Sequence, residues 1–297
     1  MQHSPFDLTN HDLYQRWREY KLRWADTPLE GRIVEIRDPR HLTSSEYRAL
    51  LERCQRYNFA LYRSTTGNDP DPQIPLHLGR ALGLQQLDRN WLGDQASGLT
   101  RLTVRHEGVR QHYIPYTNHP IRWHTDGYYN PPERNIYGLI LHCVECADGG
   151  GDNGLYDHEL AYLQLRDEDP DYLRALMRLD AMTIPPRQDE QGTSRPAQSG
   201  PVFAITREGE LHMRFTERQR NIAWHPELQA AVTRLRQLLE NHQPALRGYL
   251  QPGMGLVCNN ILHDRSGFAS DSPRLLYRGR YYDRIANTGV AGILGSK

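Results

Sequence analysis

The chain has 297 residues, of which 38% are hydrophobic and 24% charged, and its 36 Lys and Arg residues balance 36 Asp and Glu residues. A net charge near zero gives no electrostatic case for binding nucleic acid or a membrane surface, and no run of about 18 apolar residues is present to span a bilayer. Four cysteines do not make a disulfide framework, and the N-terminus lacks a secretory signal; we therefore expect a cytoplasmic protein that acts on a small molecule, with self-association left open.

The first third of the chain predicts a mixture of helices and short strands. In order, its hydrophobic spacing predicts a helix over 12–24, a strand over 32–36, a helix over 44–57, a strand over 59–62 and a helix over 75–82. Thr43-Ser44-Ser45-Glu46 is typical of a capping box and fixes the start of the third of these elements. Gly83 is a suitable residue to end the last one.

From residue 100 onward the pattern changes to short strands. These are predicted over 102–105, 113–116, 136–143, 253–258 and 275–283, and the glycine-rich run 149–154 forces a turn. No Gly-x-Gly-x-x-Gly or Walker-type loop stands where a strand would meet a helix. The sequence therefore favours a mainly β core with added helices over a Rossmann sheet.

A helical insert interrupts the predicted core. Its predicted elements are helices over 158–166 and 170–178, a loop over 185–200, a hairpin over 202–206 and 211–215, and a long helix from Pro226. We expect one domain over 1–297, with an α/β extension over 1–95, core strands within 100–150 and 200–285, and the insert within 155–250. Whether the loop over 185–200 acts as a lid is left open.

Two sequence patterns could hold a metal. In Cys143-Val144-Glu145-Cys146 the pair of cysteines has no second pair to complete a zinc site, so we interpret it as the end of a strand. In Trp123-His124-Thr125-Asp126 a His and an Asp two residues apart would lie on one face of an extended segment. One imidazole nitrogen and one carboxylate oxygen are two of the three ligands of a facial metal triad.

A second histidine follows a Pro-Gly turn near the C-terminus. The stretch from Pro252-Gly253 leads to Asn260-Ile261-Leu262-His263-Asp264-Arg265, with Phe268 three residues further and Arg274 eleven residues after His263. Together with Trp-His-Thr-Asp, this resembles the Fe(II)- and 2-oxoglutarate-dependent dioxygenases of the taurine dioxygenase (TauD/TfdA) type. The resemblance covers about 43–283, and Tyr116-Thr117-Asn118-x-Pro120 also looks like the γ-butyrobetaine hydroxylase branch.

The resemblance implies a double-stranded β-helix (jelly roll) whose Fe(II) is held by His124, Asp126 and His263. Three open positions on the metal would then take 2-oxoglutarate and O2, and Arg274 would hold the far carboxylate of 2-oxoglutarate. The residues fit this chemistry independently, because two His and one carboxylate suit non-haem iron. An arginine also offers a carboxylate two parallel hydrogen bonds. Arg278 and Arg280 lie close enough to take the place of Arg274.

The chain departs from the family pattern at the 2-oxoglutarate site. The run Gly149 to Gly154 is one residue longer than the family's and lacks its hydroxyl, so Asn153 is the candidate that would donate to the co-substrate. Asn118 is a second candidate, slightly displaced relative to the family position. Halogenating relatives replace the metal carboxylate by a small residue. This chain keeps Asp126, which favours hydroxylation or a related C–H oxidation.

The substrate candidates suggest a small anionic or zwitterionic molecule. Arg278 stands where taurine dioxygenase-like enzymes hold an anion, Tyr128 and Tyr129 could wall the pocket, and Arg214 is a further candidate. Structural roles in ion pairs or packing are equally open for these four residues. Two alternatives also remain: the same metal site used for desaturation, cyclisation or oxidative fragmentation, and a non-catalytic 2-oxoglutarate sensor or binding protein.

Overall fold

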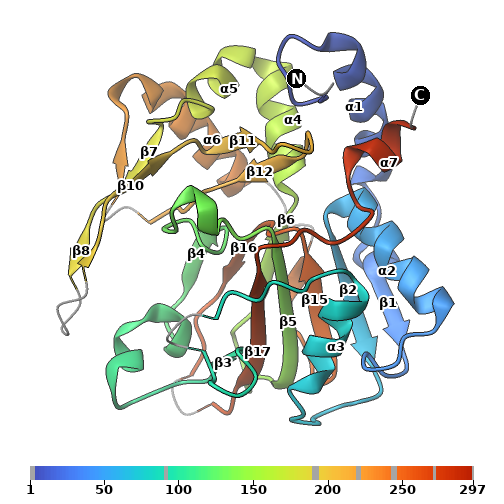
Figure 1. The fold of residues 1–297 in the computed structure, drawn as a ribbon. Coiled ribbons are helices and arrows are strands. Elements are labelled where there is room, and N and C mark those ends of the chain that lie inside the picture. Colours follow the sequence, from blue (N-terminus) through green and yellow to red (C-terminus); the bar gives the residue numbers. More distant parts are fainter. Residues whose placement is uncertain are drawn as a thin grey trace.

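The computed structural model describes residues 4–89, 93–188, 194–218, 222–241, 246–269 and 272–295. Figure 1 shows a lower part built of strands with helices on one side, and an upper part in which further helices gather near the N-terminus. The α-helices are α1 (His11–Ala25), α2 (Ser44–Tyr57), α3 (Gln73–Ala81), α4 (His158–Glu168), α5 (Pro170–Leu176), α6 (Gln229–Asn241) and α7 (Val290–Leu294). Short 3-10 turns are η1 (Leu29–Arg32), η2 (Val109–His112), η3 (Ile114–Tyr116), η4 (Pro132–Arg134) and η5 (Pro226–Leu228).

Two sheets form the core. The major sheet contains, in spatial order, β1 (Ile33–Ile36), β2 (Phe59–Ser64), β15 (Met254–Cys258), β5 (Gly138–Glu145), β17 (Leu275–Tyr281) and β3 (Thr100–Leu102). The minor sheet contains β14 (Leu246–Gly248), β6 (Asn153–Tyr156), β16 (Leu262–Arg265) and β4 (Ile121–His124). All pairs are antiparallel except β1 with β2. From β3 to β6 and from β15 to β17 the chain alternates between the sheets, which confirms the predicted jelly roll, here an open one.

Alternating side chains of the strands fill the space between the two sheets. Leu139, Leu141 and Cys143 of β5 lie in one buried cluster with Leu155 of β6 and Leu276 of β17. Successive residues of a strand point to opposite faces, so this cluster identifies the inner face of each strand. Residues two positions along from these leucines, on the same strands, therefore also point inward.

The outer face of the major sheet is covered by α2 and α3, as Figure 1 shows. Ile140 and Val257, which alternate with the inner residues, pack with Leu50 of α2 and Leu78 of α3. The predicted capping box is present, because the Thr43 hydroxyl accepts from the Glu46 N–H and the Glu46 carboxylate accepts from the Thr43 N–H. The helix ends at Asn58, whose φ of 62° is left-handed.

The insert runs from the end of β6 to the start of β14. Besides α4, α5 and α6 it contains the short strands β7 (Met182–Ile184), β8 (Arg187–Gln188), β9 (Ser194–Arg195), β10 (Gln198–Gly200), β11 (Phe203–Ile205), β12 (Leu211–Met213) and β13 (Ala223–Trp224). Its apolar side chains share one cluster with Phe6 and with Trp17 of α1. The described part of 203–241 contributes no strand to the two core sheets, although Thr216 forms an isolated bridge with His124 of β4. The predicted core range 200–285 and the predicted insert range 155–250 overlap here, and the core strands resume at β14.

Several predicted elements differ from the structure. The strand predicted over 113–116 is wrong, because Ile114–Tyr116 forms a 3-10 turn in which Pro115 has no N–H to give to a ladder. The predicted loop over 185–200 contains the small pairs β8–β9 and β10–β7, and residues 189–193 of it lie outside the described part. The four cysteines are free thiols, and Cys143 points into the core rather than toward a metal.

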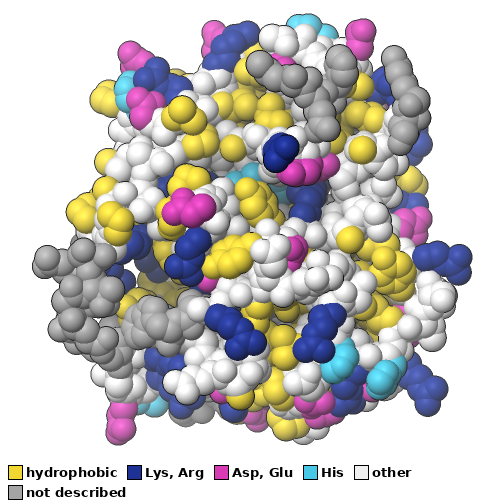
Figure 2. Space-filling view, viewed as in Figure 1, with side chains coloured by type: hydrophobic (Ala, Val, Ile, Leu, Met, Phe, Trp, Pro, Cys, Tyr) yellow, Lys and Arg dark blue, Asp and Glu magenta, His cyan; other side chains and the backbone are white. Residues whose placement is uncertain are grey.

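The surface carries both charge signs. Figure 2 shows acidic and basic side chains scattered over one face, with basic ones beside a hollow between the β8–β9 hairpin and β4. Among the helices of the described ranges, none is both long and apolar enough to cross a membrane.

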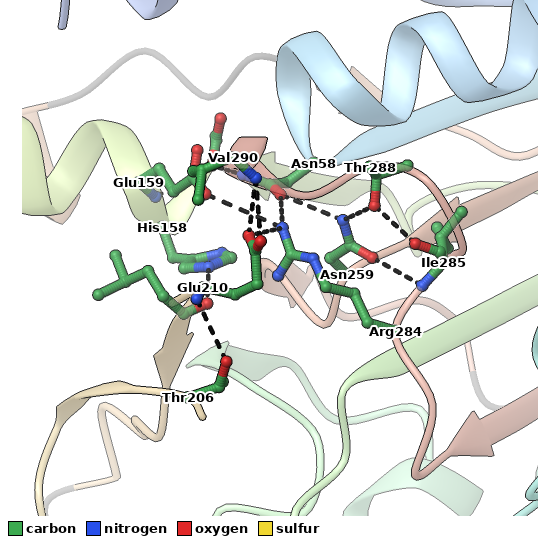
Figure 3. A network of polar contacts seen from close by, with 12 residues as sticks. Asn58, His158, Glu159, Thr206, Glu210, Asn259, Arg284, Ile285, Thr288 and Val290 are labelled. Atoms are coloured by element: carbon green, nitrogen blue, oxygen red, sulfur yellow. Dashed lines mark hydrogen bonds and ion pairs between the residues drawn. The ribbon is translucent and has the colours of Figure 1, made fainter. Parts of the chain in front are cut away.

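A buried polar network joins the insert, α2 and the C-terminal segment. Arg284 lies at its centre, where it donates to Asn58 Oδ1 at 2.8 Å and faces Glu159 and Glu210 at 3.9 and 3.8 Å (Figure 3). Asn259 donates to Asn58 from the other side. Since the two carboxylates are buried and the half-buried Arg284 lies beside both, the opposite charges compensate one another. Through Asn259 it reaches the turn that precedes β16.

Candidate metal centre

His124, Asp126 and His263 converge at one end of the minor sheet. His124 is the last residue of β4 and lies directly opposite His263 of β16 in the antiparallel pairing of these strands. Their rings are 4.2 Å apart between centroids. One donor atom from each of the three residues lies within 4.8 Å of the others. The sheet register, set by residues 139 positions apart in sequence, therefore assembles the triad that the sequence predicted.

Both imidazoles have the orientation that a metal ligand requires. Nδ1 of His124 lies 2.9 Å from the carbonyl oxygen of Arg122, and Nδ1 of His263 lies 2.9 Å from that of Ile261. A carbonyl oxygen only accepts, so Nδ1 carries the proton in each ring. The Nε2 lone pair of each histidine is then available to a cation, and the backbone bond fixes the ring orientation.

Asn260 fixes the backbone of the metal carboxylate. Its Oδ1 accepts from the Asp126 N–H at 2.8 Å, and its Nδ2 donates to the carbonyl oxygens of Asp126 and Ile136 at 2.9 and 2.7 Å. Asn260 is buried, and its φ of 47° lies in the left-handed region that asparagine tolerates. This role was not predicted from the sequence. The Asn259-Asn260 pair before β16 was the available signal, since asparagine favours such turns.

The surroundings of the triad favour the protonation states in which Asp126 and His124 can bind a metal ion. Burial alone would raise the pKa of the Asp126 carboxyl, but the charges of Arg278 and Arg280 hold it well below its ordinary value. Burial, and then the neighbouring His263, lower the pKa of His124 to about 3. The carboxylate is thus ionised and this imidazole neutral near pH 7, which are the forms that bind a metal ion. Two nitrogens and one oxygen on one side of a shared centre fit Fe(II).

Arg278 contacts the metal carboxylate directly. Its Nη1 lies 3.2 and 3.5 Å from the two carboxylate oxygens of Asp126. It stands two residues after the inward-facing Leu276 on β17, so its side chain enters from the major sheet. Its Nε is buried and has no hydrogen-bond partner among the described groups. One edge of the guanidinium therefore remains free to bind another anion.

Arg274 is buried beside Phe268. Its guanidinium carbon lies 5.3 Å from the Phe268 ring centroid, and only 6% of the residue is exposed. Burial lowers its pKa to about 10, so it is still charged at neutral pH. No carboxylate in the described ranges pairs with it. Arg274 precedes β17, and a register shift between Leu275 and Leu276 separates it from the regular ladder.

The two candidate asparagines lie near this arginine. Asn153 of β6 pairs in register with Arg265 of β16, two residues from the inward-facing Leu155, and donates weakly to Gly151 O at 3.5 Å. Asn118 donates to Phe268 O at 3.0 Å and accepts, through its own carbonyl, from the Phe268 N–H. The Asn118 amide therefore holds a loop in place, whereas Asn153 keeps donor capacity that faces the space between the sheets.

The remaining candidates lie on the side of the triad that faces the insert. The Tyr128 ring stands edge-on to His124 at 6.5 Å and to Tyr129 at 5.1 Å. The Tyr129 hydroxyl accepts from Arg280 at 2.8 Å, and Arg280 is paired with the buried Asp88. These contacts among Asp88, Arg280 and Tyr129 were not predicted, because Asp88 lies far in sequence from the motifs around His124 and His263.

Arg214 has a different place from the one predicted. Its guanidinium donates to four main-chain carbonyl oxygens, at Tyr128, Met182, Gly200 and Gln198, over 2.7 to 3.4 Å. Since carbonyls occupy most of its N–H groups, Arg214 ties the insert to the segment after Asp126. The geometry does not support the prediction that it binds the substrate.

Comparisons with known proteins agree with this site. The model of the taurine catabolism dioxygenase TauD, TfdA family matches residues 25–280. An Amycolatopsis uridine-5′-phosphate dioxygenase is 26% identical over 276 residues, covering 84% of this chain and 95% of that protein. A Streptomyces uridine-5′-phosphate dioxygenase is 30% identical over 194 residues, covering 60% and 68%. The solved structure of AAD-2 with Mn(II) and N-oxalylglycine shares the fold, with a TM-score of 0.60, 14% identity, and coverage of 86% and 97%.

Proposed function

The chain belongs to the taurine catabolism dioxygenase TauD/TfdA family and is an Fe(II)- and 2-oxoglutarate-dependent oxygenase, and from this premise we propose that it oxidises a nucleoside 5′-monophosphate, with uridine 5′-phosphate as the first candidate. The observation that carries the proposal is the match to a uridine-5′-phosphate dioxygenase along 95% of that protein's length. The match therefore extends over most of both chains.

The basic side chains near the metal centre support a phosphate-bearing substrate. Arg278 offers a free guanidinium edge beside Asp126. Further out, two arginines form no ion pair with a described carboxylate and lie near tyrosines of the site: Arg195 by Tyr129 and Arg218 by Tyr128. In a chain of zero net charge, this local excess of cations suits a dianion.

The aromatic residues support a planar group on the substrate. The Tyr128–Tyr129 pair stands between the metal centre and these arginines, and stacking on an aromatic ring is a common way to bind a nucleobase. Burial raises the pKa of the Tyr128 hydroxyl, so it remains a neutral hydrogen-bond donor. A base on the tyrosines and a phosphate on the arginines would orient the sugar toward the metal.

Different residues of the chain would bind the metal and the co-substrate. His124, Asp126 and His263 would hold Fe(II), and Arg274 would hold the distal carboxylate of 2-oxoglutarate. When bound, the iron supplies oxidation of a substrate C–H bond by O2, coupled to conversion of 2-oxoglutarate to succinate and CO2. Asp126 is retained and supported by Asn260, which favours hydroxylation over halogenation. Desaturation, cyclisation and fragmentation remain alternatives that product mass distinguishes.

A substrate panel tests the proposal. Purified protein with Fe(II) and 2-oxoglutarate should form succinate faster with uridine 5′-phosphate than with uridine, which lacks only the phosphate. Cytidine and adenosine 5′-phosphates test the base, and γ-butyrobetaine tests the branch that residues 116–120 resemble. Equal stimulation by uridine would overturn the role of the phosphate, and stimulation by γ-butyrobetaine alone would overturn the nucleotide. Bound 2-oxoglutarate without succinate under every condition would indicate a binding protein.

A further inference from the structure

A second buried arginine lies beside Arg274. Arg265 of β16 is 5% exposed, and its guanidinium carbon lies 5.0 Å from the centroid of the same Phe268 ring that Arg274 contacts at 5.3 Å. Arg265 pairs in register with Asn153, two residues from His263 and Leu155 on their strands. All these side chains therefore project from one face, into the space between the sheets.

The charge of this arginine pair is not balanced within the described chain. Neither Arg265 nor Arg274 pairs with a carboxylate that the structure describes, whereas Arg278 pairs with Asp126 and Arg280 with Asp88. Arg265 Nη2 donates to the carbonyl oxygens of Thr117 and His119, but its Nε is buried without any partner. Burial, and then the charge of Arg274, lower the pKa of Arg265 to about 9.

Two buried like charges and an unused donor require compensation. A buried donor without a partner costs free energy, and a buried unpaired charge costs more. A third donor faces the same space, because one Asn153 N–H is engaged only at 3.5 Å. An anion between the two guanidinium groups would satisfy these requirements together.

We propose that Arg265 is a second binding residue for the distal carboxylate of 2-oxoglutarate, acting with Arg274 on either side of Phe268. Arg265 also holds the main chain at Thr117 and His119, so it joins the co-substrate site to the loop that leads into β4 and His124. Co-substrate binding would then order this loop as well as the metal centre. The inference depends on the co-substrate alone and is independent of which prime substrate the enzyme uses.

Calorimetric titration without a prime substrate tests this role. Glutarate, which has the distal carboxylate but no keto group, is titrated into metal-free protein, and N-oxalylglycine into Mn(II)-loaded protein. We expect Arg265→Gln to weaken both ligands at least about tenfold, and Arg265→Lys, which keeps the charge, to weaken them less. Arg265→Gln that binds both ligands as the wild type does would overturn the proposal and leave Arg265 as a loop anchor only.

A matched control separates binding from loss of structure. Arg32 is also buried, donates to two main-chain carbonyls and lies over two aromatic rings, but it is far from the triad in the fold. Arg32→Gln should lower the melting temperature without changing glutarate affinity. If Arg265→Gln does not fold, the wild-type crystal structure with N-oxalylglycine decides. A distal carboxylate within hydrogen-bonding distance of Arg265 Nε, directly or through one water, supports the proposal, and a longer separation overturns it.

Discussion

The side-chain amide of Asn260 brackets the peptide of Asp126, accepting from its N–H at 2.8 Å and donating to its carbonyl at 2.9 Å. The metal carboxylate follows β4 in a turn, where no ladder holds it, so Asn260 supplies the order that a strand would otherwise give. Thr125 is fixed from the opposite side by two hydrogen bonds with Phe215. Asn260 is therefore a positioning residue for the metal ligand.

Removing the Asn260 amide should weaken metal binding. Asn260→Gly keeps a residue that tolerates the left-handed φ of 47°, so it isolates the loss of the amide from backbone strain. Because supporting residues of this kind typically contribute about 10–100-fold to metal affinity, we expect a loss of that size for Fe(II) or Mn(II). Direct metal titration measures it. Unchanged metal affinity in a folded variant would show that Asp126 needs no such support.

The three ligands should be individually essential. Asp126→Ala and His263→Ala should each abolish succinate formation, since loss of one ligand in three removes most of the affinity for iron. The melting temperature of His263→Ala in the absence of metal should stay close to that of the wild type, because the only hydrogen bond that the structure gives this imidazole is the one to Ile261. Asp126→Ala also loses the ion pair with Arg278, so its melting temperature should be lower. Either variant that consumed 2-oxoglutarate at the wild-type rate would contradict the metal assignment.

Substitutions of Arg274 and Arg278 should affect the binding of two different anions, 2-oxoglutarate and the prime substrate. Arg274→Gln should raise the apparent KM for 2-oxoglutarate by at least about tenfold, because hydrogen bonds to a charged group are worth about 1.5–3 kcal/mol. Arg278→Gln should raise the KM for the prime substrate instead. Substrate-independent decay of 2-oxoglutarate reports on Arg274 alone, and metal titration of Arg278→Gln corrects for the lost contact with Asp126. If Arg278→Gln is the variant that loses 2-oxoglutarate affinity, the two roles are exchanged.

Asp88 should stabilise the fold in a pH-dependent manner. Burial would raise the pKa of its carboxyl, but Arg280, Tyr282 and Arg134 together hold it below the ordinary 3.8. A carboxyl with a depressed folded pKa stabilises the protein above pH 3.8, and this contribution is lost as the pH falls through the folded pKa. Breaking such a buried pair costs about 3–5 kcal/mol, so Asp88→Asn should lose about this much at pH 7.

Urea unfolding at several pH values measures this effect. The difference between the wild type and Asp88→Asn should begin to shrink below about pH 4, because the carboxyl of the unfolded chain is then protonated, and it should continue to shrink until the pH falls through the folded pKa. Asp38→Asn is the matched control, since Asp38 pairs with Arg40 at a partly exposed site, where an ion pair is worth at most about 1 kcal/mol. A difference that stayed constant from pH 7 to pH 3 would show that folding does not shift the pKa of Asp88.

Helices whose ends are marked by residues within the helix or next to it were predicted from the sequence. The capping box at Thr43 and the spacing behind it gave the bounds of α2, and Pro170 marked the start of α5. Strands β4 and β16 were not predicted as strands, because each has only four residues and is defined by its partner rather than by its own pattern. The triad was nevertheless predicted, because the order and spacing of the motifs around His124 and His263 can be recognised without knowing that these residues lie on strands.

The rest of the site depends on neighbours that no local pattern specifies. Arg214 looks like a substrate ligand in sequence, yet four carbonyls from three segments converge on it. Asn260 and Arg265 stand within the quoted motif without a visible role, because their partners are Asp126 and residues 117–119, more than 130 positions earlier. Such roles follow from tertiary contacts alone, so the sequence predicted the chemistry of the centre but not its supports.

Strand β4 is the outermost strand of the minor sheet, and its ladder partner is β16. At its end, residues 215–217 bond to its other edge through an isolated bridge between His124 and Thr216. It ends at His124, with Asp126 two residues beyond, while the third ligand is on the neighbouring strand. A bound ion would therefore act as a cross-link between an edge strand and its ladder partner, joining residues 139 positions apart. Fraying of β4 would open the centre by separating two ligands from the third. Iron should then slow amide hydrogen exchange over 121–126, and the rate of local opening of this edge should limit how fast the metal leaves.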